Sequence, residues 1–302
     1  MPVFRFRART LVIALLAGSI ASCRSSSSDA RDTPNATARD DFGTAIAMNA
    51  VPRRIVSLNP TTTEILFAIG AGPRVVGRTH FDLYPAEAQR VPDLGPGIRP
   101  NVEAVLATRP DLVVLYASAD DRPTADRLRE AHIPVVAFKV DDIEGFRRVT
   151  RLLGRIVGQS ARADSLVDSV SATLERVRRA TASLPRPIVV VHTWDRPVIV
   201  IGGTSFLSEL LDIAGARNAY ADARTATVTV TLEDILRRDP DIVLAGPQDA
   251  RRIIVSNDWR TLRAVKDGRV FAYDTNLVAR PSVQLGAAAV SLANLFHPGA
   301  VR

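Results

Sequence analysis

The sequence predicts an α/β protein of two lobes, each built on a parallel sheet with helices on both faces, joined by one long helix. Three observations lead to this fold class. A helix-and-strand unit near residue 101 recurs about 130 residues later, strand-like apolar runs alternate with helical patterns in both halves, and the middle shows no strand pattern over about forty residues. A chain of 302 residues is long enough for two domains of this kind.

The repeated unit is a short helix followed by a buried strand. Residues 101–115 read NVEAVLATRPDLVVL, and residues 231–244 read TLEDILRRDPDIVL. Each copy opens with a helix-capping Asn or Thr, carries a glutamate in its first turn (Glu103 or Glu233), and passes through a Pro-Asp turn into an apolar run. Each lobe therefore presents one glutamate at an equivalent place on its surface.

The N-terminal residues 1–22 predict a lipoprotein signal peptide. Arginines before residue 10 give a positive start, and the apolar stretch that follows, about ten residues, is too short to span a membrane. Small residues precede Cys23, the only cysteine, as in a bacterial lipobox, where the thiol is lipidated and becomes the mature N-terminus. An ordinary signal peptide with an incidental cysteine is the alternative.

A flexible tether is expected over residues 23–50, because Ser, Asp, Thr and Ala dominate there and large apolar residues are scarce. The N-terminal lobe follows over residues 51–141. Its strand patterns lie in the segments 53–58, 75–77, 112–115 and 135–138. The Thr-x-x-Glu sequence that ends at Glu64 predicts a capping box, so Glu64 is assigned mainly to structure.

Residues 142–184 predict the connection between the lobes. A first helix reaches Val157, and apolar residues at helical spacing mark a second from Ser160 to Ser183. At 1.5 Å per residue the second helix would be about 36 Å long, enough to join two lobes as a stiff strut.

The C-terminal lobe is expected over residues 185–302. A second series of strands and helices fills it, with strands at 188–191, 198–201 and 270–273, the second copy of the repeat, and helices at 205–214 and 281–296.

Together these features resemble the helical-backbone (class III) substrate-binding proteins of bacterial ABC importers, which carry cobalamin, ferric siderophores or haem. The resemblance covers about residues 51–297 and implies two Rossmann-like lobes with a ligand cleft between them and little closure on binding. The matching segments are Arg54–Leu58 with Thr63-Glu64, the loop Gly77–Pro85, both repeats, the long central helix, Gly202–Ser205, and Trp259 with Val265–Val270.

The resemblance implies that Glu103 and Glu233 dock onto arginines of a permease dimer. A pseudo-symmetric protein that meets a two-fold partner needs the same charge twice. Alternatively, each glutamate only favours its own helix N-terminus through the helix dipole. The expected protein is a monomer in the periplasm or on the outer face of a bacterial membrane, anchored by lipid, with the permease dimer as its partner.

Candidate ligand-binding residues follow strands, where open α/β sheets bind ligands. By position, Phe81 matches an aromatic residue that packs on the corrin ring in the cobalamin-binding member of the family. A tryptophan that precedes the first docking acid there is replaced here by Gly97–Pro100, so Trp194 or Tyr116 would supply the missing ring. The candidates are Asn59, His80, Phe81, Tyr84, Tyr116, His192, Thr193, Trp194, Asp195, Asn276 and Arg280.

The expected ligand is a corrinoid, either cobalamin or cobinamide, with a ferric siderophore second and haem third. His80 or His192 could ligate the cobalt or iron of such a ligand. The arginines at 99, 196 and 280 and Tyr116 could meet an anionic siderophore. No separate cofactor and no dedicated metal site are expected, since four histidines and one lipidated cysteine offer few ligands.

Composition and motifs argue against two other classes of protein. The net charge is +7, but the basic residues are scattered among acids, so nucleic-acid binding is not expected. The sequence contains no Gly-x-Ser-x-Gly, no His-Glu-x-x-His and no phosphate-binding loop, so an enzyme is not expected. The remote alternative is a lipid-anchored hydrolase that uses Ser57 or Ser205 with His80 or His192.

Overall fold

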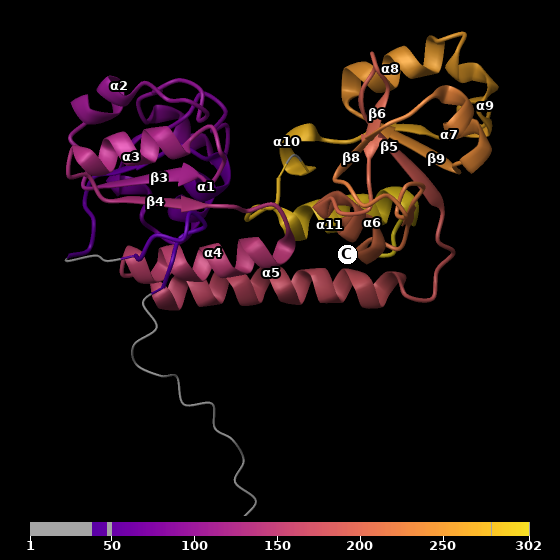
Figure 1. The fold of residues 1–302 in the computed structure, drawn as a ribbon. Helices are drawn as coiled ribbons and strands as arrows, with labels where there is room; N and C mark the ends of the chain where they lie inside the picture. The colour runs from indigo at the N-terminus through magenta and orange to yellow at the C-terminus, as the bar shows by residue number, and fades with distance from the viewer. Residues whose placement is uncertain (1–37, 47–49, 279, 302) are drawn as a thin grey trace, which may run out of the picture. The chain divides into compact units, whose positions relative to one another are not determined.

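The computed structural model describes residues 38–46, 50–278 and 280–301 (Figure 1). The predicted signal peptide and the lipidation site at Cys23 lie outside these residues. Within the described ranges, no helix combines the length and the apolar character needed to cross a membrane.

The N-terminal lobe is a four-stranded parallel sheet in the order β2-β1-β3-β4. Runs of Val, Ile and Leu form these strands because both faces of a parallel sheet are covered. The strands are β1 Ile55–Ser57, β2 Val75–Gly77, β3 Leu112–Tyr116 and β4 Val135–Phe138; the helices are α1 Pro60–Ala68, α2 Val102–Ala107 and α3 Arg122–Glu130, with 3-10 turns η1 Gly72–Arg74 and η2 Ala86–Arg90.

Alternate residues of each strand face opposite layers of this lobe. Leu112 and Val114 pack into a core shared with α1 and α4 (Ile143–Ile156). Val113 and Leu115 face a separate core that contains residues of α2 and α3. The sheet is therefore covered on both sides, as the sequence predicted.

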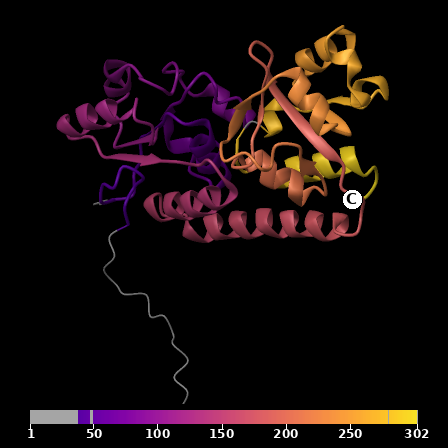
Figure 2. The same cartoon turned by 45° about the vertical axis from the view of Figure 1, so that its right-hand side comes forward.

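The connection consists of α4 and α5 (Ser160–Thr181), which lie side by side in Figures 1 and 2. Gly154 of α4 allows this close approach, because an added Cβ would lie 2.4 Å from the Cβ of Ala163. Farther along its length, α5 packs against α6 and α11 of the C-terminal lobe. Since α4 packs against α1 of the N-terminal lobe, the two helices together connect the lobes, which agrees with the predicted two-lobed architecture.

The C-terminal lobe holds a six-stranded sheet in the order β10-β9-β5-β6-β8, with β7 paired to β5. Its strands are β5 Ile188–Trp194, β6 Ile199–Ile201, β7 Arg217–Asn218, β8 Thr227–Thr229, β9 Ile242–Ala245 and β10 Val270–Ala272. Its helices are α6 Phe206–Ile213, α7 Leu232–Arg238, α8 Pro247–Val255, α9 Arg263–Lys266, α10 Thr275–Val278 and α11 Leu285–Phe296, with the 3-10 turn η3 Trp259–Thr261.

The sheet of the C-terminal lobe is mixed, whereas the sequence predicted a parallel one. Strands β10, β9 and β5 pair in parallel, but β6 pairs antiparallel with both β5 and β8. The reason is the short connection between β5 and β6, residues 195–198, which allows a hairpin and is too short for a parallel crossover.

Residues 38–46 pack onto the N-terminal lobe, so the prediction of a tether as far as residue 50 is wrong for this stretch. Asp40 is buried and forms an ion pair with Arg129 at 3.2 Å. The composition of this stretch is polar, but its acids find partners in the lobe.

Candidate ligand-binding site

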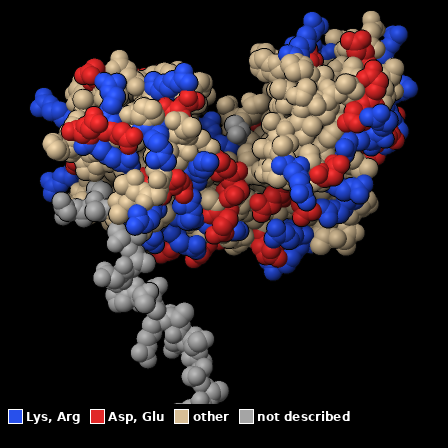
Figure 3. Space-filling view, viewed as in Figure 1, with Lys and Arg blue, Asp and Glu red and all other residues tan. Residues whose placement is uncertain are grey.

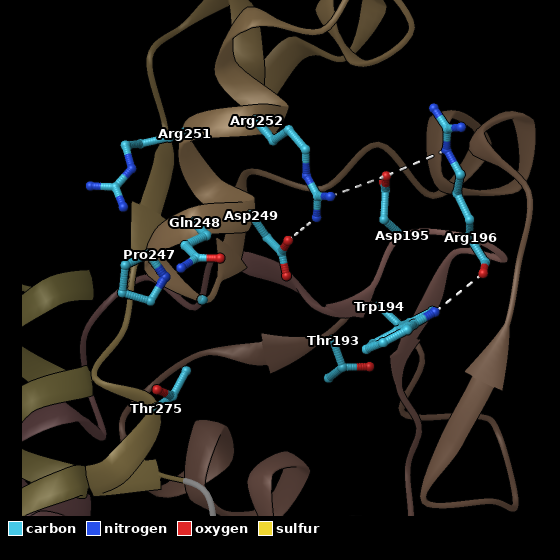
Figure 4. Close-up of a pocket in the computed structure, with 11 residues that line it drawn as sticks. Thr193, Trp194, Asp195, Arg196, Pro247, Gln248, Asp249, Arg251, Arg252 and Thr275 are labelled. Carbon is cyan, nitrogen blue, oxygen red and sulfur yellow. Dashed lines mark hydrogen bonds and ion pairs between the residues drawn. The ribbon is translucent and has the colours of Figure 1, made fainter.

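A pocket of about 920 Å³ lies in the C-terminal lobe, where β5 and β9 end and α8 and α10 begin (Figure 4). This is the carboxyl edge of the parallel strands, the usual ligand position in open α/β sheets, and the volume suits a small molecule. The lining residues are Thr193, Trp194, Asp195, Arg196, Gly246, Pro247, Gln248, Asp249, Arg251, Arg252 and Thr275.

Acids and arginines alternate around this pocket. Arg252 forms ion pairs with Asp249 and, at 3.8 Å, with Asp195. The same Asp195 lies 3.8 Å from Arg196. Arg251 has no ion-pair partner among the described residues, and Figure 4 shows its side chain directed away from the Arg252 cluster. The pocket therefore offers hydrogen-bond donors and acceptors side by side.

Trp194 is the large apolar side chain of the pocket, with 62% of its surface exposed. Its Nε1 donates a hydrogen bond to the carbonyl oxygen of Arg196 at 3.2 Å, which orients the ring over the hairpin turn. The exposed ring borders the pocket beside Asp195 and Arg196, so the pocket has one flat apolar surface among its polar groups.

His192 lies beneath the pocket and is fully buried, with its ring edge-on to Trp259 at 5.5 Å between centroids. Its Nε2 lies 3.9 Å from Asp195 and its Nδ1 lies 3.7 Å from Asp249. Burial lowers the pKa of His192, and the two acids oppose this shift. Because the ring has no exposed surface, the prediction that His192 contacts the ligand does not hold in this structure.

The loop after β2 presents its aromatic side chains outward. Phe81 is 56% exposed and Tyr84 is 45% exposed. The ring of His80 lies beside that of Phe81, tilted by 60°, with the centroids 4.1 Å apart. Between them Asp82 is buried and accepts hydrogen bonds from the backbone and hydroxyl of Thr79 and from the hydroxyl of Thr63. This inward anchor fixes the loop, so the rings remain at the surface.

Three other predicted ligand contacts have structural partners. Asn59 is buried and caps α1, accepting a hydrogen bond from the backbone of Thr61 at 3.0 Å. The hydroxyl of Tyr116 donates to Asp141 at 2.6 Å. Arg280 lies 3.7 Å from the carboxylate of Glu64. Asn59 is therefore a helix cap. The side chains of Tyr116 and Arg280 are each paired with an acid of the protein itself.

Glu64 does not form the predicted capping box. Because α1 begins at Pro60 with Asn59 as its cap, Glu64 falls in the second turn, where its side chain is buried. Burial raises the pKa of Glu64 to about 7, while Ser282, Arg280 and Gln284 lower it. Glu64 comes from the N-terminal lobe and its partners from the segment before α11, so the pair joins the two lobes.

The comparisons with known proteins fix the family. A sequence profile described as periplasmic binding protein matches residues 55–277. The chain belongs to this family. It consists of substrate-binding transport proteins, which work with transporter permeases and are not enzymes, so the predicted family and fold class are confirmed.

Two relatives of this periplasmic binding protein have informative names. It is 32% identical over 266 residues to the uncharacterized ABC transporter substrate-binding lipoprotein YvrC of Bacillus subtilis, covering 84% of this chain and 82% of YvrC. It is 31% identical over 277 residues to a cobalamin-binding protein of Halobacterium salinarum, covering 86% of this chain and 74% of the relative.

Solved structures of periplasmic binding proteins share the fold. The vitamin B12-binding protein BtuF of Vibrio cholerae superposes with a TM-score of 0.71 at 20% identity, covering 81% of this chain and 96% of BtuF. The heme-binding protein RhuT from Roseiflexus superposes with a TM-score of 0.73 at 24% identity, covering 82% of this chain and 99% of RhuT. At these identities the likeness concerns the fold alone.

The two glutamates of the repeat are exposed on this binding protein. Glu103 follows the cap of α2, has a side chain 79% exposed, and lies 3.6 Å from Arg127. Glu233 follows the cap of α7, and its own backbone amide and the Thr231 hydroxyl lower its pKa. On the face shown in Figure 3, acidic and basic side chains are interleaved over much of the surface.

The serines of the hydrolase alternative have structural roles in this binding protein. Ser57 is buried and hydrogen bonds to the hydroxyl of Thr62 at 2.8 Å. Ser205 caps α6, accepting from the backbone of Leu207. In the part of the chain that the structure describes, no group of three His, Cys, Asp or Glu residues could hold a metal ion.

Seven of the eleven residues that line the pocket were not predicted from the sequence. Asp249, Arg251 and Arg252 belong to α8, which begins directly after β9. The sequence held a signal for these residues. Gly246-Pro247 ends the apolar run of the second repeat and so marks the carboxyl end of a strand, where open α/β sheets bind ligands.

Proposed function

We propose that this binding protein carries a corrinoid, cobalamin or cobinamide, to an ABC import permease. The alternation of acids and arginines in the pocket is the observation that carries the proposal. Corrinoids bear amide side chains, whose NH₂ groups donate hydrogen bonds and whose carbonyl groups accept them. Asp195 and Asp249 are acceptors for such amides, and Arg196 and Arg252 are donors.

The other ligand classes fit this pocket less well. The pocket holds two acids, Asp195 and Asp249, and three arginines, Arg196, Arg251 and Arg252. Both acids are paired with arginines, and only Arg251 has no ion-pair partner among the described residues. One such cation does not balance the two propionates of haem or the several charges of an anionic siderophore, whereas the paired acids and arginines still accept and donate hydrogen bonds to uncharged amides. The relative from Halobacterium salinarum, which is 31% identical and is named a cobalamin-binding protein, supports the corrinoid.

The apolar face of a corrin needs flat apolar walls. In this proposal Trp194 supplies one from the C-terminal lobe, and Phe81 and Tyr84 supply others from the N-terminal lobe. All three rings are exposed and positioned by backbone turns, so little side-chain ordering opposes binding.

Exchanging the pocket acids for amides tests the proposal. The variant Asp195→Asn/Asp249→Asn keeps the side-chain volumes but removes two negative charges. If the ligand is a corrinoid, its affinity falls at least tenfold, about 1.4 kcal/mol, whereas weak haemin binding becomes stronger. Asp267→Asn, an exposed acid outside the pocket, is the matched control. Tighter binding of cobinamide by the double variant would contradict the proposal.

We also propose that Cys23 carries the lipid anchor and that the protein works at the outer face of a membrane. The relative YvrC is named a lipoprotein, which supports a lipid anchor here. Cys23→Ala should move the protein from the membrane to the soluble fraction. Absence of palmitate label on the wild-type protein would contradict the anchor and leave the ligand proposal intact.

Docking completes the proposed function. Glu103 and Glu233 present the same charge at the start of equivalent helices, one on each lobe, and both carboxylates are exposed. A monomer of this protein would meet a permease dimer through these two charges.

A further inference from the structure

Strand β4 is an edge of the N-terminal sheet, since it pairs only with β3 among the described strands. Its free edge is occupied by residues 38–46. The backbone amide of Asp41 donates to the carbonyl oxygen of Ala137 at 2.9 Å. In turn the Asp40 carboxylate accepts from the amide of Ala137 at 3.2 Å, and the Asp41 carboxylate accepts from the amide of Lys139 at 2.6 Å. Side-chain oxygens thus replace the carbonyls that a neighbouring strand would supply.

Asp40 is the centre of this attachment, with 4% of its surface exposed. Its carboxylate also accepts from the amides of Phe42 at 3.0 Å and Thr44 at 2.8 Å and pairs with Arg129 at 3.2 Å. A buried carboxylate is tolerated when donors surround it in this way. Asp41 adds an ion pair with Arg148 of α4 at 2.8 Å.

The segment is folded as a unit. Arg39 and Ala45 form an antiparallel bridge, and the amide of Ile46 donates to the carbonyl oxygen of Ala38 at 2.7 Å. Gly43 has a φ of +82°, a conformation that favours glycine in such a turn. Phe42 packs against one core of the lobe and under the guanidinium of Arg122, and Ile46 packs against the other core.

We propose that residues 38–46 form a clasp that fixes the exit point of the membrane tether at the free edge of β4. The clasp lies outside residues 55–277, the part of the chain that the family profile matches. The inference about reach rests on the proposed lipid anchor at Cys23.

The clasp shortens the reach of the anchored protein. Fifteen residue-to-residue steps lead from Cys23 to Ala38, which limits the span to about 50 Å at about 3.3–3.6 Å per step. A tether that continued to Ala50 would reach about 95 Å. A shorter tether raises the concentration of the binding protein near a permease in the same membrane. Covering β4 also removes a free edge that could pair with another chain.

Hydrogen exchange on the mature chain, residues 23–302, tests the clasp. In Asp40→Asn/Asp41→Asn, peptides that cover residues 38–46 and 135–139 should exchange at least tenfold faster than in the wild type. Arg129→Gln, which loosens the same contact from the lobe, should accelerate the same peptides. Asp126→Asn is the control, because Asp126 pairs with Arg129 at 3.3 Å but lies outside the clasp.

Two outcomes would overturn the clasp: residues 38–46 exchanging at the unprotected rate in the wild type, or equal protection in the wild type and the double variant. The lipid anchor is tested separately on vesicles, by energy transfer from the domain to acceptors in the membrane. The double variant should lie farther from the acceptors than the wild type. If energy transfer is absent from both proteins while the hydrogen-exchange results are as predicted, the lipid anchor is rejected and the clasp remains. If energy transfer is equal in the wild type and the double variant, the shortened reach is rejected.

Discussion

Trp194 and Phe81 are large rings that the fold leaves in solvent, one on each lobe. Trp194 is 62% exposed and Phe81 is 56% exposed, and each is held by its own turn, the first by the hairpin after β5 and the second by the buried Asp82. Rings positioned in this way keep their apolar area available for a ligand.

Trp194→Ala or Phe81→Ala should each weaken cobinamide binding at least tenfold, about 1.4 kcal/mol, because each removes one wall of the proposed site. Thermal unfolding should change little, since both rings are exposed. Leu236→Ala removes an exposed apolar side chain of α7 and is the control. Equal affinity of both ring variants and the control would show that these rings do not touch the ligand.

Glu64 should make the stability of the protein depend on pH. Burial raises its pKa from 4.5 to about 7 in the folded state, so the folded protein binds an extra proton between these values. The free energy of unfolding should therefore fall as the pH rises from 4.5 to 7, by up to about 3 kcal/mol for this group. Glu64→Gln should flatten this dependence in urea titrations at pH 4.5, 6 and 7.5. An unchanged slope would show that Glu64 titrates normally.

Individual ligand contacts were the least predictable feature of the sequence. The sequence predicted a ligand contact for Trp194 because a strand end is a local signal, and Trp194 lines the pocket. It could not show that the hydroxyl of Tyr116 is held by Asp141 or that Arg280 faces Glu64, since such partners come from distant segments. Arg252 was missed because the strand end before it, at Gly246-Pro247, was not interpreted as part of the site.

At the scale of elements, α4 and α5 form the stiff part of the connection. Gly154→Ala places a methyl group 2.4 Å from the Cβ of Ala163, which forces the helices apart and should destabilise the fold by about 1–3 kcal/mol. Adding Ala163→Gly restores the space, so the double variant should be more stable than Gly154→Ala alone in urea unfolding. Strictly additive effects would mean that the two residues do not touch.

Elements with a local signature were predicted best. The spacing of apolar residues placed α5 at 160–183, and the structure has it at Ser160–Thr181. The antiparallel pairing of β6 was missed because it depends on the length of one turn. Residues 38–46 were assigned to the tether because their attachment uses carboxylates and backbone amides, which leave no apolar pattern.

For the whole molecule, the repeat is the central feature. The two copies form α2–β3 and α7–β9, and each helix begins with a capping residue and an exposed glutamate. Because the copies lie on different lobes, the molecule carries one such exposed charge on each lobe. The comparisons confirm the family on which this interpretation depends.

Glu103→Arg with Glu233→Arg should abolish transport in reconstituted vesicles and leave ligand affinity unchanged, since the reversed charges would repel permease arginines. Glu130→Arg with Glu144→Arg makes the same charge change at other exposed positions and should transport normally. Loss of ligand binding in the first variant would assign these glutamates to the ligand site instead.

Corrinoid binding is the central claim, and calorimetric titration of the purified protein tests it most directly. Cyanocobalamin, cobinamide, haemin and a hydroxamate siderophore would be titrated in turn under the same conditions. We predict one-to-one binding of cobinamide or cyanocobalamin with a Kd in the micromolar range or tighter, without any turnover of the ligand. Binding of haemin or the siderophore alone would contradict the corrinoid assignment and leave the family and the fold unchanged.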